Sequence, residues 1–209
     1  MSSNGLFVVF EGPDGVGKSS LVKAVAVRLD ELGYSNVVVT REPSDGVYGQ
    51  RVRAVLRGEV QATAHELAAL FADDRADHLR REILPRLLDG CTVLCDRYLL
   101  SSMVYQYAVA GVPWATVRHL NRYAPPADVM FLLDAPIELC AERMGKRGTT
   151  KDIMETNKAQ WLAHCEYQNR MHWAWTANKT KVIDATQTIA DLAELVTTHI
   201  VAEMATNNV

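Results

Sequence analysis

A glycine-rich stretch near the start of the chain has the residue types of a phosphate-binding loop. The stretch GPDGVGKS spans residues 12–19 and matches the spacing G-x-x-x-x-G-K-S/T. It directly follows the apolar run of residues 6–10, which has the length and composition of a buried strand. Glycines let successive backbone N–H groups turn toward phosphate oxygens, and a helix that begins after the loop adds its positive end. The spacing in this context predicts a nucleotide site, and the alternative is a plain turn that connects strand to helix.

Two side chains at the end of this loop carry the predicted chemistry. Lys18 places a cation at the β- and γ-phosphates, and Ser19 offers a hydroxyl to Mg²⁺, which keeps several waters in such sites. Asp96 ends another apolar run, so we expect it at the same edge of the sheet, where it binds Mg²⁺ through water. A capping role for Asp96 at the start of the next helix is the alternative.

Arginines form the second candidate group, because a guanidinium fork suits a phosphate. Arg41 and Arg97 follow predicted strands and are expected to face the loop, whereas Arg75 lies in a helical pattern. Solvation at the surface is the alternative for each arginine. A second phosphate site indicates a kinase whose acceptor is a phosphate monoester. Such an acceptor is mostly dianionic at neutral pH and needs no general base.

Alternating strands and helices are expected to position these residues. Apolar runs rich in β-formers predict five strands, at residues 6–10, 36–40, 91–95, 129–133 and 181–184. Helical apolar spacing lies between them, for example at Leu21, Val25 and Leu29. This order predicts an α/β fold with a five-stranded parallel sheet flanked by helices, and ligands at the carboxyl ends of the strands. Pro85 is expected to kink or shorten the second long helix.

The composition is that of an ordinary globular protein. The 209 residues carry a formal net charge of -3, which argues against nucleic acid as a partner. No apolar run approaches the ~20 residues of a membrane span, and the start of the chain lacks the pattern of a signal peptide, so we expect a cytoplasmic protein with no membrane contact. Cys91, Cys95, Cys140 and Cys165 have neither zinc nor redox spacing, and we expect buried, reduced thiols.

Four segments together resemble the thymidylate kinases, which are P-loop nucleoside monophosphate kinases. They are FVVFEGPDGVGKSS, TREPS, LFADDRADH and DRYLLSSMVYQ, in this order. The resemblance runs from the first predicted strand to VIDAT in the last one. It implies the three-layer P-loop kinase fold as a single domain over residues 1–209, with the phosphate loop at 12–19 and a mobile lid at about 143–155. It also implies Mg²⁺-dependent transfer of the γ-phosphoryl group of ATP to dTMP, giving dTDP, and a homodimer.

The resemblance assigns roles to single residues. Asp14 approaches the 3′-hydroxyl of dTMP, Phe71 stacks on thymine, and Tyr105 disfavours a ribose. The residues expected to bind ATP are Gly12, Pro13, Asp14, Gly15, Val16, Gly17, Lys18, Ser19 and Ser20. Those expected to bind dTMP are Asp14, Arg41, Pro43, Leu56, Phe71, Arg75, Arg97, Ser101, Ser102, Tyr105 and Gln160. Catalytic roles are expected for Lys18, Asp14, Asp96, Arg97, Arg143 and Arg147.

The lid departs from the family pattern. Some relatives carry an arginine in the phosphate loop directly after the acidic residue, but this chain has Gly15 there. The catalytic cation is therefore expected from the lid, where Arg143, Lys146 and Arg147 are the candidates.

Patterns alone favour plainer roles for the aromatic residues. Phe71 fits an ordinary core position on a helix, and core or interface packing is expected for Trp161, Tyr167, Trp173 and Trp175. Two other functions stand beside the dTMP kinase. A deoxynucleoside kinase acting on thymidine requires a carboxylate base near its acceptor hydroxyl. An ATP-gated switch or binding module requires no second anion site.

Overall fold

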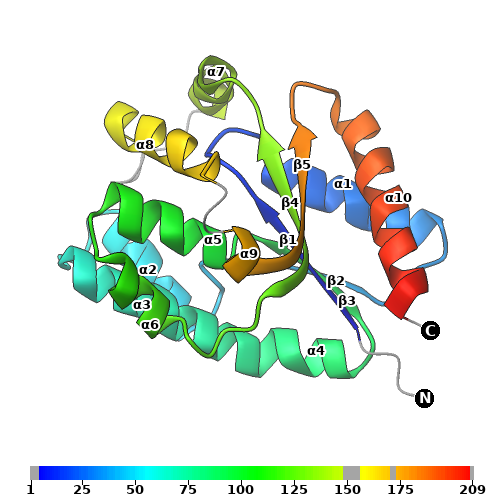
Figure 1. The fold of residues 1–209 in the computed structure, drawn as a ribbon, viewed down its shortest axis with the longest axis horizontal. Helices are drawn as coiled ribbons and strands as arrows, with labels where there is room; N and C mark the ends of the chain where they lie inside the picture. The colour runs from blue at the N-terminus through cyan, green and yellow to red at the C-terminus, as the bar shows by residue number, and fades with distance from the viewer. Residues whose placement is uncertain (1–4, 148–155, 170–172, 208–209) are drawn as a thin grey trace.

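A five-stranded parallel sheet lies at the centre of the computed structural model, which describes residues 5–147, 156–169 and 173–207 (Figure 1). Its strands are β1 (Leu6–Glu11), β2 (Val37–Arg41), β3 (Thr92–Asp96), β4 (Ala127–Asp134) and β5 (Ala177–Asp184). All neighbouring pairs are parallel, and the order across the sheet is β2-β3-β1-β4-β5. The predicted α/β fold with a five-stranded parallel sheet is confirmed.

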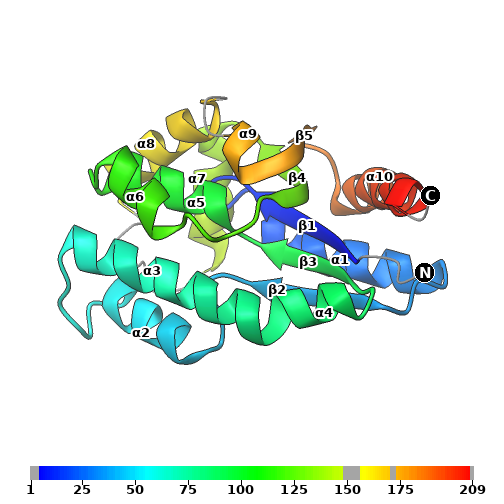
Figure 2. The same cartoon turned by 60° about the horizontal axis from the view of Figure 1, so that its bottom comes forward.

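Helices cover both faces of this sheet, as Figures 1 and 2 show. Leu6, Val8 and Phe10 of β1 belong to one core, with α1 (Lys18–Glu31) and α10 (Ile189–Asn207). The alternate residues, Phe7 and Val9, belong to the opposite core. The other helices are α2 (Val47–Leu56), α3 (Ala64–His78), α4 (Leu84–Leu88), α5 (Leu99–Ser102), α6 (Trp114–Leu120), α7 (Ile137–Arg147), α8 (Asn157–Tyr167) and α9 (Trp173–Thr176). Two segments are π-helical, η1 (Leu79–Ile83) and η2 (Met103–Val109).

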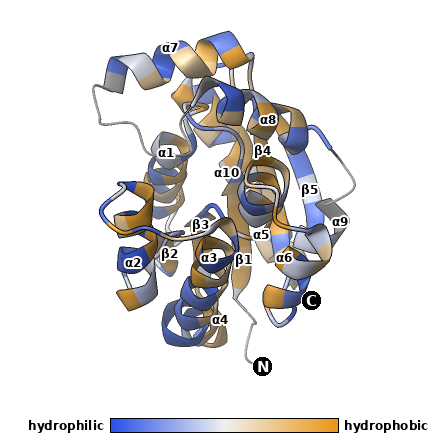
Figure 3. Ribbon diagram, turned by 90° about the vertical axis from the view of Figure 1, so that its left-hand side faces the viewer, coloured by the Kyte–Doolittle hydropathy of each residue, from blue (hydrophilic) through white to orange (hydrophobic). Residues whose placement is uncertain are grey.

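Burial of the strands follows their place in the sheet. β1 lies in the middle and is buried along its whole length, whereas the edge strands β2 and β5 carry exposed positions. Figure 3 shows the same contrast, because β1 and β4 are hydrophobic and β5 carries hydrophilic positions. The most apolar strands therefore hold the phosphate loop, which directly follows β1.

The long helical segment that starts with α3 changes its winding before Pro85. Thr63 and Glu66 form a capping box that fixes the start of α3. The helix then passes through the π-helical η1 into α4, where Pro85 stands at the first turn. Proline has no N–H to donate and its ring crowds the preceding turn, so the predicted interruption takes the form of a wider π-helical turn.

The expectation of buried thiols is wrong at Cys165, and of the two places expected for Trp161, the core or an interface, the structure excludes the core. All four cysteines are free, but only Cys95 and Cys140 are buried, and Cys165 is exposed. Trp161 is 57% exposed and therefore outside the core. Trp161 and Cys165 lie four residues apart on the solvent face of α8, opposite the buried Ala163. The side chain of Trp173 lies outside the described residues.

Membrane-spanning helices are both long and apolar. Within residues 5–147, 156–169 and 173–207, no helix combines sufficient length with sufficient apolar character to cross a bilayer.

Candidate active site

Residues 12–17 form a tight loop between β1 and α1. Gly12 and Gly15 have φ angles of 141° and 81°, a region that L side chains rarely adopt. A Cβ atom at Gly12 would lie 2.6 Å from the carbonyl oxygen of Leu133 in β4. A Cβ atom at Gly15 would lie 2.2 Å from the carbonyl oxygen of Cys140 in α7. Glycine is needed at both positions because neighbouring backbone leaves no room for a side chain.

Lys18 begins α1 and is buried beneath the loop. Its Nζ donates to the carbonyl oxygens of Gly12 and Pro13, each at 2.8 Å. Burial, reinforced by the Arg97 guanidinium, lowers the pKa of Lys18 to about 8, although the carboxylate of Asp14 acts in the opposite direction. A phosphate bound in the loop favours the ammonium form, so the anion and the Lys18 charge stabilise each other.

Ser19 and Asp96 meet beside the loop. Ser19 Oγ donates to Asp96 Oδ2 at 2.5 Å. The other oxygen, Asp96 Oδ1, is buried and has no hydrogen-bond partner within the part of the chain that the structure describes. A buried carboxylate oxygen without a partner is costly, and hydroxyl and carboxylate oxygens are ligands that Mg²⁺ prefers. The donor set therefore fits a magnesium ion held by Ser19 and, through water, by Asp96.

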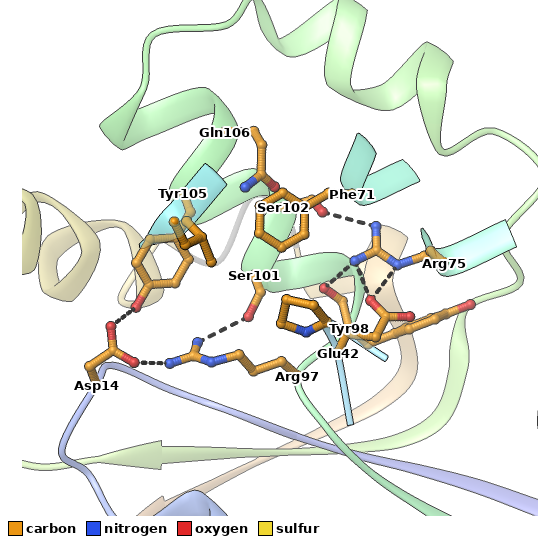
Figure 4. Close-up of a pocket in the computed structure, with 12 residues that line it drawn as sticks. Asp14, Glu42, Phe71, Arg75, Arg97, Tyr98, Ser101, Ser102, Tyr105 and Gln106 are labelled. Carbon is orange, nitrogen blue, oxygen red and sulfur yellow. Dashed lines mark hydrogen bonds and ion pairs between the residues drawn. The ribbon is translucent and has the colours of Figure 1, made fainter. Parts of the chain in front are cut away.

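A cavity opens beside the loop. The residues that line it are Asp14, Glu42, Pro43, Leu56, Phe71, Arg75, Arg97, Tyr98, Ser101, Ser102, Tyr105 and Gln106 (Figure 4). A second cavity, lined by the phosphate loop, Ser19 and Asp96, shares Asp14, Glu42, Pro43 and Arg97 with the first. The two cavities are therefore adjacent, and Asp14 and Arg97 belong to the wall between them.

Arg97 and Asp14 form an ion pair in the wall between the cavities. Arg97 Nη2 donates to Asp14 Oδ1. The other oxygen of Asp14 accepts from the Tyr105 hydroxyl at 2.8 Å and from Gln160 Nε2 at 3.0 Å. Burial opposes ionisation of Asp14, but the cations of Arg97 and Lys18 outweigh it and hold the pKa of the carboxyl well below its usual range. Asp14 is thus an anchored anion and a weak base.

The backbone of Arg97 is unusual. Among the described residues, Arg97 is the one non-glycine residue with a positive φ, at 74°. Such a conformation costs about 1 kcal/mol or more and persists where the surroundings hold it. The neighbouring residues of the site therefore hold the backbone of Arg97 in this strained conformation.

Arg75 lies at the other end of the cavity, and protein groups engage all five of its N–H donors (Figure 4). Nε and Nη2 donate to Glu42 Oε2 at 2.9 and 2.6 Å. Nη1 donates to Ser102 Oγ and Asn121 Oδ1, and Nη2 also donates to the carbonyl oxygen of Tyr98. Burial disfavours the cation, but Glu42 outweighs it, and the pKa of Arg75 is raised. Arg75 is a fixed part of the cavity wall.

The segment from α5 into η2 supplies one side of the cavity. Ser101 and Ser102 end α5, and Tyr105 and Gln106 belong to the π-helical η2. Gln106 is buried, and its Oε1 has no hydrogen-bond partner among the described residues. Short π-helical segments are frequent at functional sites, and here one carries an acceptor oxygen that a ligand can use.

Comparison with known proteins identifies the family. A family model described as "Thymidylate kinase" matches residues 10–196. The chain belongs to the thymidylate kinase family. A Pyrococcus horikoshii protein described as "Probable thymidylate kinase" is 34% identical over 193 residues, which cover 90% of this chain and 92% of that protein. The Desulfotalea psychrophila "Thymidylate kinase" is 39% identical over 139 residues, which cover 66% of this chain and 68% of that protein.

Most residues that the resemblance assigned to the acceptor line the first cavity of this family member, but Arg41 and Gln160 do not. The Arg41 side chain is 63% exposed, pairs with Asp45 at 3.0 Å and borders the phosphate-loop cavity instead. Gln160 reaches the site through its hydrogen bond with Asp14. Ser20, expected at the ATP site, is exposed on α1.

The candidates from the lid lie on α7 or beyond the described residues. Arg143 Nη1 donates to the carbonyl oxygens of Val16 at 3.0 Å and Ala185 at 3.1 Å, so it ties α7 to the phosphate loop. Lys146 is exposed on the same helix. Arg147 ends α7, but its side chain lies outside the described residues, as does the rest of the predicted lid.

Besides Tyr98, which lines the cavity, four residues that the sequence reasoning missed belong to the site. Glu42 holds Arg75, Gln106 offers an unpaired acceptor, and Glu11 and Tyr167 lie behind Arg97. Three of them stand inside the segments that carry the family resemblance, so the sequence held a signal for them. Tyr167 lies outside those segments, and its pattern indicated only packing.

Proposed function

We propose that this chain transfers the γ-phosphoryl group of ATP to dTMP, giving dTDP. The observation that carries the proposal is the wall shared by the phosphate-loop cavity and the cavity beside it, which includes Asp14 and Arg97. A donor phosphate in the loop and an acceptor phosphate at Arg97 would lie side by side, which is the positioning that phosphoryl transfer requires.

The donor side follows from the loop. Its backbone N–H groups and Lys18 bind the phosphates of ATP, and Ser19 and Asp96 hold Mg²⁺, the latter through water. When bound, Mg²⁺ neutralises charge on the phosphates during transfer. The acceptor phosphate is mostly dianionic at neutral pH, so the chain needs no general base.

The acceptor side follows from the cavity lining. Phe71 is half-buried and offers a flat apolar face to the pyrimidine ring. The buried Gln106 Oε1 accepts the ring N–H of thymine. Tyr105, held through its hydroxyl by Asp14, packs against the sugar, and Arg97 binds the phosphate. Pro43 and Leu56 close the apolar side of the cavity.

Arg143 and Arg147 supply the cations of α7 in this proposal. The contacts of Arg143 with two carbonyl oxygens support a role in holding α7 against the phosphate loop. Arg147, four residues further along the chain, remains a candidate beside Arg143 and Lys146 for the cation that neutralises the transferring phosphoryl group.

The described carboxylates of the cavity favour a phosphate acceptor over a hydroxyl. A deoxynucleoside kinase needs a carboxylate that is free to take a proton. Both carboxylates that line the cavity are already engaged, Asp14 by Arg97 and Glu42 by Arg75. An ATP-gated switch would need only the phosphate-loop cavity, so it does not explain the cavity lined by Phe71 and Tyr105.

The test is a coupled assay of ADP release with ATP and Mg²⁺ that compares dTMP, dUMP, dCMP, thymidine and no acceptor. We expect the fastest turnover with dTMP. Faster turnover with thymidine supports the deoxynucleoside kinase, and release of ADP that is independent of any acceptor supports the switch.

We further propose a cytoplasmic homodimer of one-domain subunits that uses no nucleic-acid partner. The net charge of -3 supports the last point, and the family resemblance supports the dimer. Analytical ultracentrifugation tests the dimer, because a single species at the monomer mass contradicts it.

A further inference from the structure

Two hydroxyl groups connect Arg97 to one buried carboxylate. Arg97 Nη1 donates to the Tyr167 hydroxyl at 2.9 Å and to Ser101 Oγ at 3.2 Å. Ser101 Oγ donates to Glu11 Oε2 at 2.7 Å, and the Tyr167 hydroxyl lies 3.2 Å from the same oxygen. Glu11 is 0% exposed, so water does not compete for these bonds. The four residues form a closed network behind the guanidinium.

The chemistry of the two ends fixes the direction of each proton in this network. A guanidinium only donates, and an ionised carboxylate only accepts. Both hydroxyls therefore turn their lone pairs to Arg97 and their protons toward Glu11, either directly or, for Tyr167, through Ser101. Burial, reinforced by Glu11, raises the pKa of Tyr167, which keeps its proton. Neither hydroxyl has a proton left for a ligand, so both act on Arg97.

Glu11 also fixes the backbone that carries Arg97. Its Oε1 accepts from the backbone N–H groups of Tyr98 at 2.8 Å and Ser101 at 3.0 Å. Tyr98 directly follows the strained position at Arg97, and Ser101 lies one helical turn further on. Glu11 thus holds the left-handed turn, while Tyr167 and Ser101 hold the end of the side chain.

We propose that Tyr167 and Glu11 are positioning residues that aim Arg97 at the acceptor phosphate. The Tyr167 hydroxyl, Ser101 Oγ and the Gly12 carbonyl oxygen occupy Nη1, and Asp14 occupies one N–H of Nη2, while Nε makes no hydrogen bond within the described residues. The Nε and Nη2 edge, which suits a phosphate, is thereby kept for the ligand. This inference rests on the proposed function, because it takes the bound anion to be the acceptor.

The first test is Tyr167→Phe, which removes one hydroxyl and keeps the ring beside Tyr105. We expect kcat/KM for dTMP to fall about tenfold, because a hydrogen bond to a charged group is lost, while KM for ATP stays unchanged. Tyr123→Phe makes the same chemical change at a tyrosine that is 83% exposed, and it should leave both parameters unchanged.

A double-mutant cycle with Arg97→Lys separates positioning from a general structural role. If Tyr167 acts through Arg97, adding Tyr167→Phe to Arg97→Lys changes kcat/KM for dTMP less than about twofold. A further tenfold loss in that background overturns the inference alone. A wild type that shows no turnover with dTMP overturns the proposed function, and this inference with it.

Glu11→Gln tests the direction of the protons. The amide oxygen then takes the place that faces the two backbone N–H groups, and the amide NH₂ donates to the hydroxyls, whose protons turn toward Arg97. We expect kcat/KM for dTMP to fall roughly a hundredfold, more than for Tyr167→Phe, because donors now face a donor. A smaller loss than that of Tyr167→Phe contradicts the proposed network.

Discussion

Arg75 and Arg97 stand at the two ends of one cavity and differ in what they leave for a ligand. The protein engages every N–H of Arg75, whose side chain is 2% exposed. Arg97 is 17% exposed, is held along one edge, and keeps Nε unpaired among the described residues. A saturated arginine shapes a pocket, whereas an arginine held on one side can bind an anion. An arginine that lines a pocket can therefore bind an anion only if the protein leaves some of its N–H donors unpaired.

The carboxylate partners show the same difference. Glu42, which pairs with Arg75, is 3% exposed, and Asp14, which pairs with Arg97, is 22% exposed. Removing the cation from the buried pair leaves a charge that water cannot reach, whereas water and Lys18 can compensate Asp14. The Arg75 end should therefore matter most for folding, and the Arg97 end for turnover.

The largest effect is expected for Arg97→Ala. We expect kcat/KM for dTMP to fall roughly 10⁴-fold, because arginines that neutralise a transferring phosphoryl group contribute on that order. The Kd for ATP should change little, and steady-state kinetics with a separate ATP titration measure both. Unchanged turnover would show that Arg97 does not act on the substrate, and it would contradict the proposed difference between Arg97 and Arg75.

The next effect is expected in stability, for Arg75→Met. The free energy of unfolding should fall by roughly 3 to 5 kcal/mol in urea denaturation, because Glu42 is left buried without its partner. Adding Glu42→Gln should restore part of this loss, since it removes the unpaired charge. A loss no larger than that of Arg97→Ala would contradict the difference between the two ends.

The smallest effect concerns His78, which extends the Arg75 end of the cavity. Its Nδ1 lies 3.5 Å from Glu42 and its Nε2 lies 3.5 Å from Glu82 and 2.7 Å from Thr40 Oγ1. Burial favours the neutral ring, but Glu42, followed by Glu82 and Asp74, outweighs burial and raises the pKa of His78 above 6.5. The stabilisation is therefore complete below about pH 6.5 and is lost as the pH rises through the raised value.

His78→Gln should remove this pH dependence. The difference in free energy of unfolding between the wild type and this variant is expected to narrow as the pH rises from 6 to 9, as measured by urea denaturation at each pH. Thr197→Val, a buried change on α10 away from the ionised groups, is the control and should show a difference that does not vary with pH. A constant difference for His78→Gln as well would show that the ring stays neutral.

Local sequence patterns predicted the sheet, and the family resemblance predicted most of the residues that line the cavity. Runs such as residues 6–10 and 129–133 are too apolar and too short for anything but buried strands, and the structure contains both. The family segments supplied Asp14, Phe71 and Arg97, which the fold brings to one cavity. These predictions succeeded because each rests on a short stretch of consecutive residues, which can be read directly in the sequence.

The partners of the arginines could not be predicted in this way. Glu11 and Tyr167 are separated by 156 positions, and their contact exists only once α8 packs beside β1 and α5. The exposure of Trp161 and Cys165 could not be predicted for a related reason, since the sequence shows the apolar residues of a helix but not which face the rest of the chain will cover.

The left-handed backbone at Arg97 costs stability, whereas the side chain at this position serves activity. At this position glycine or asparagine would adopt the observed φ of 74° with less strain, so selection for stability alone would replace the arginine. A variant that is both more stable and inactive is the expected product of such selection. The arginine persists only while function is also selected, and a thermostability screen without an activity screen would lose it.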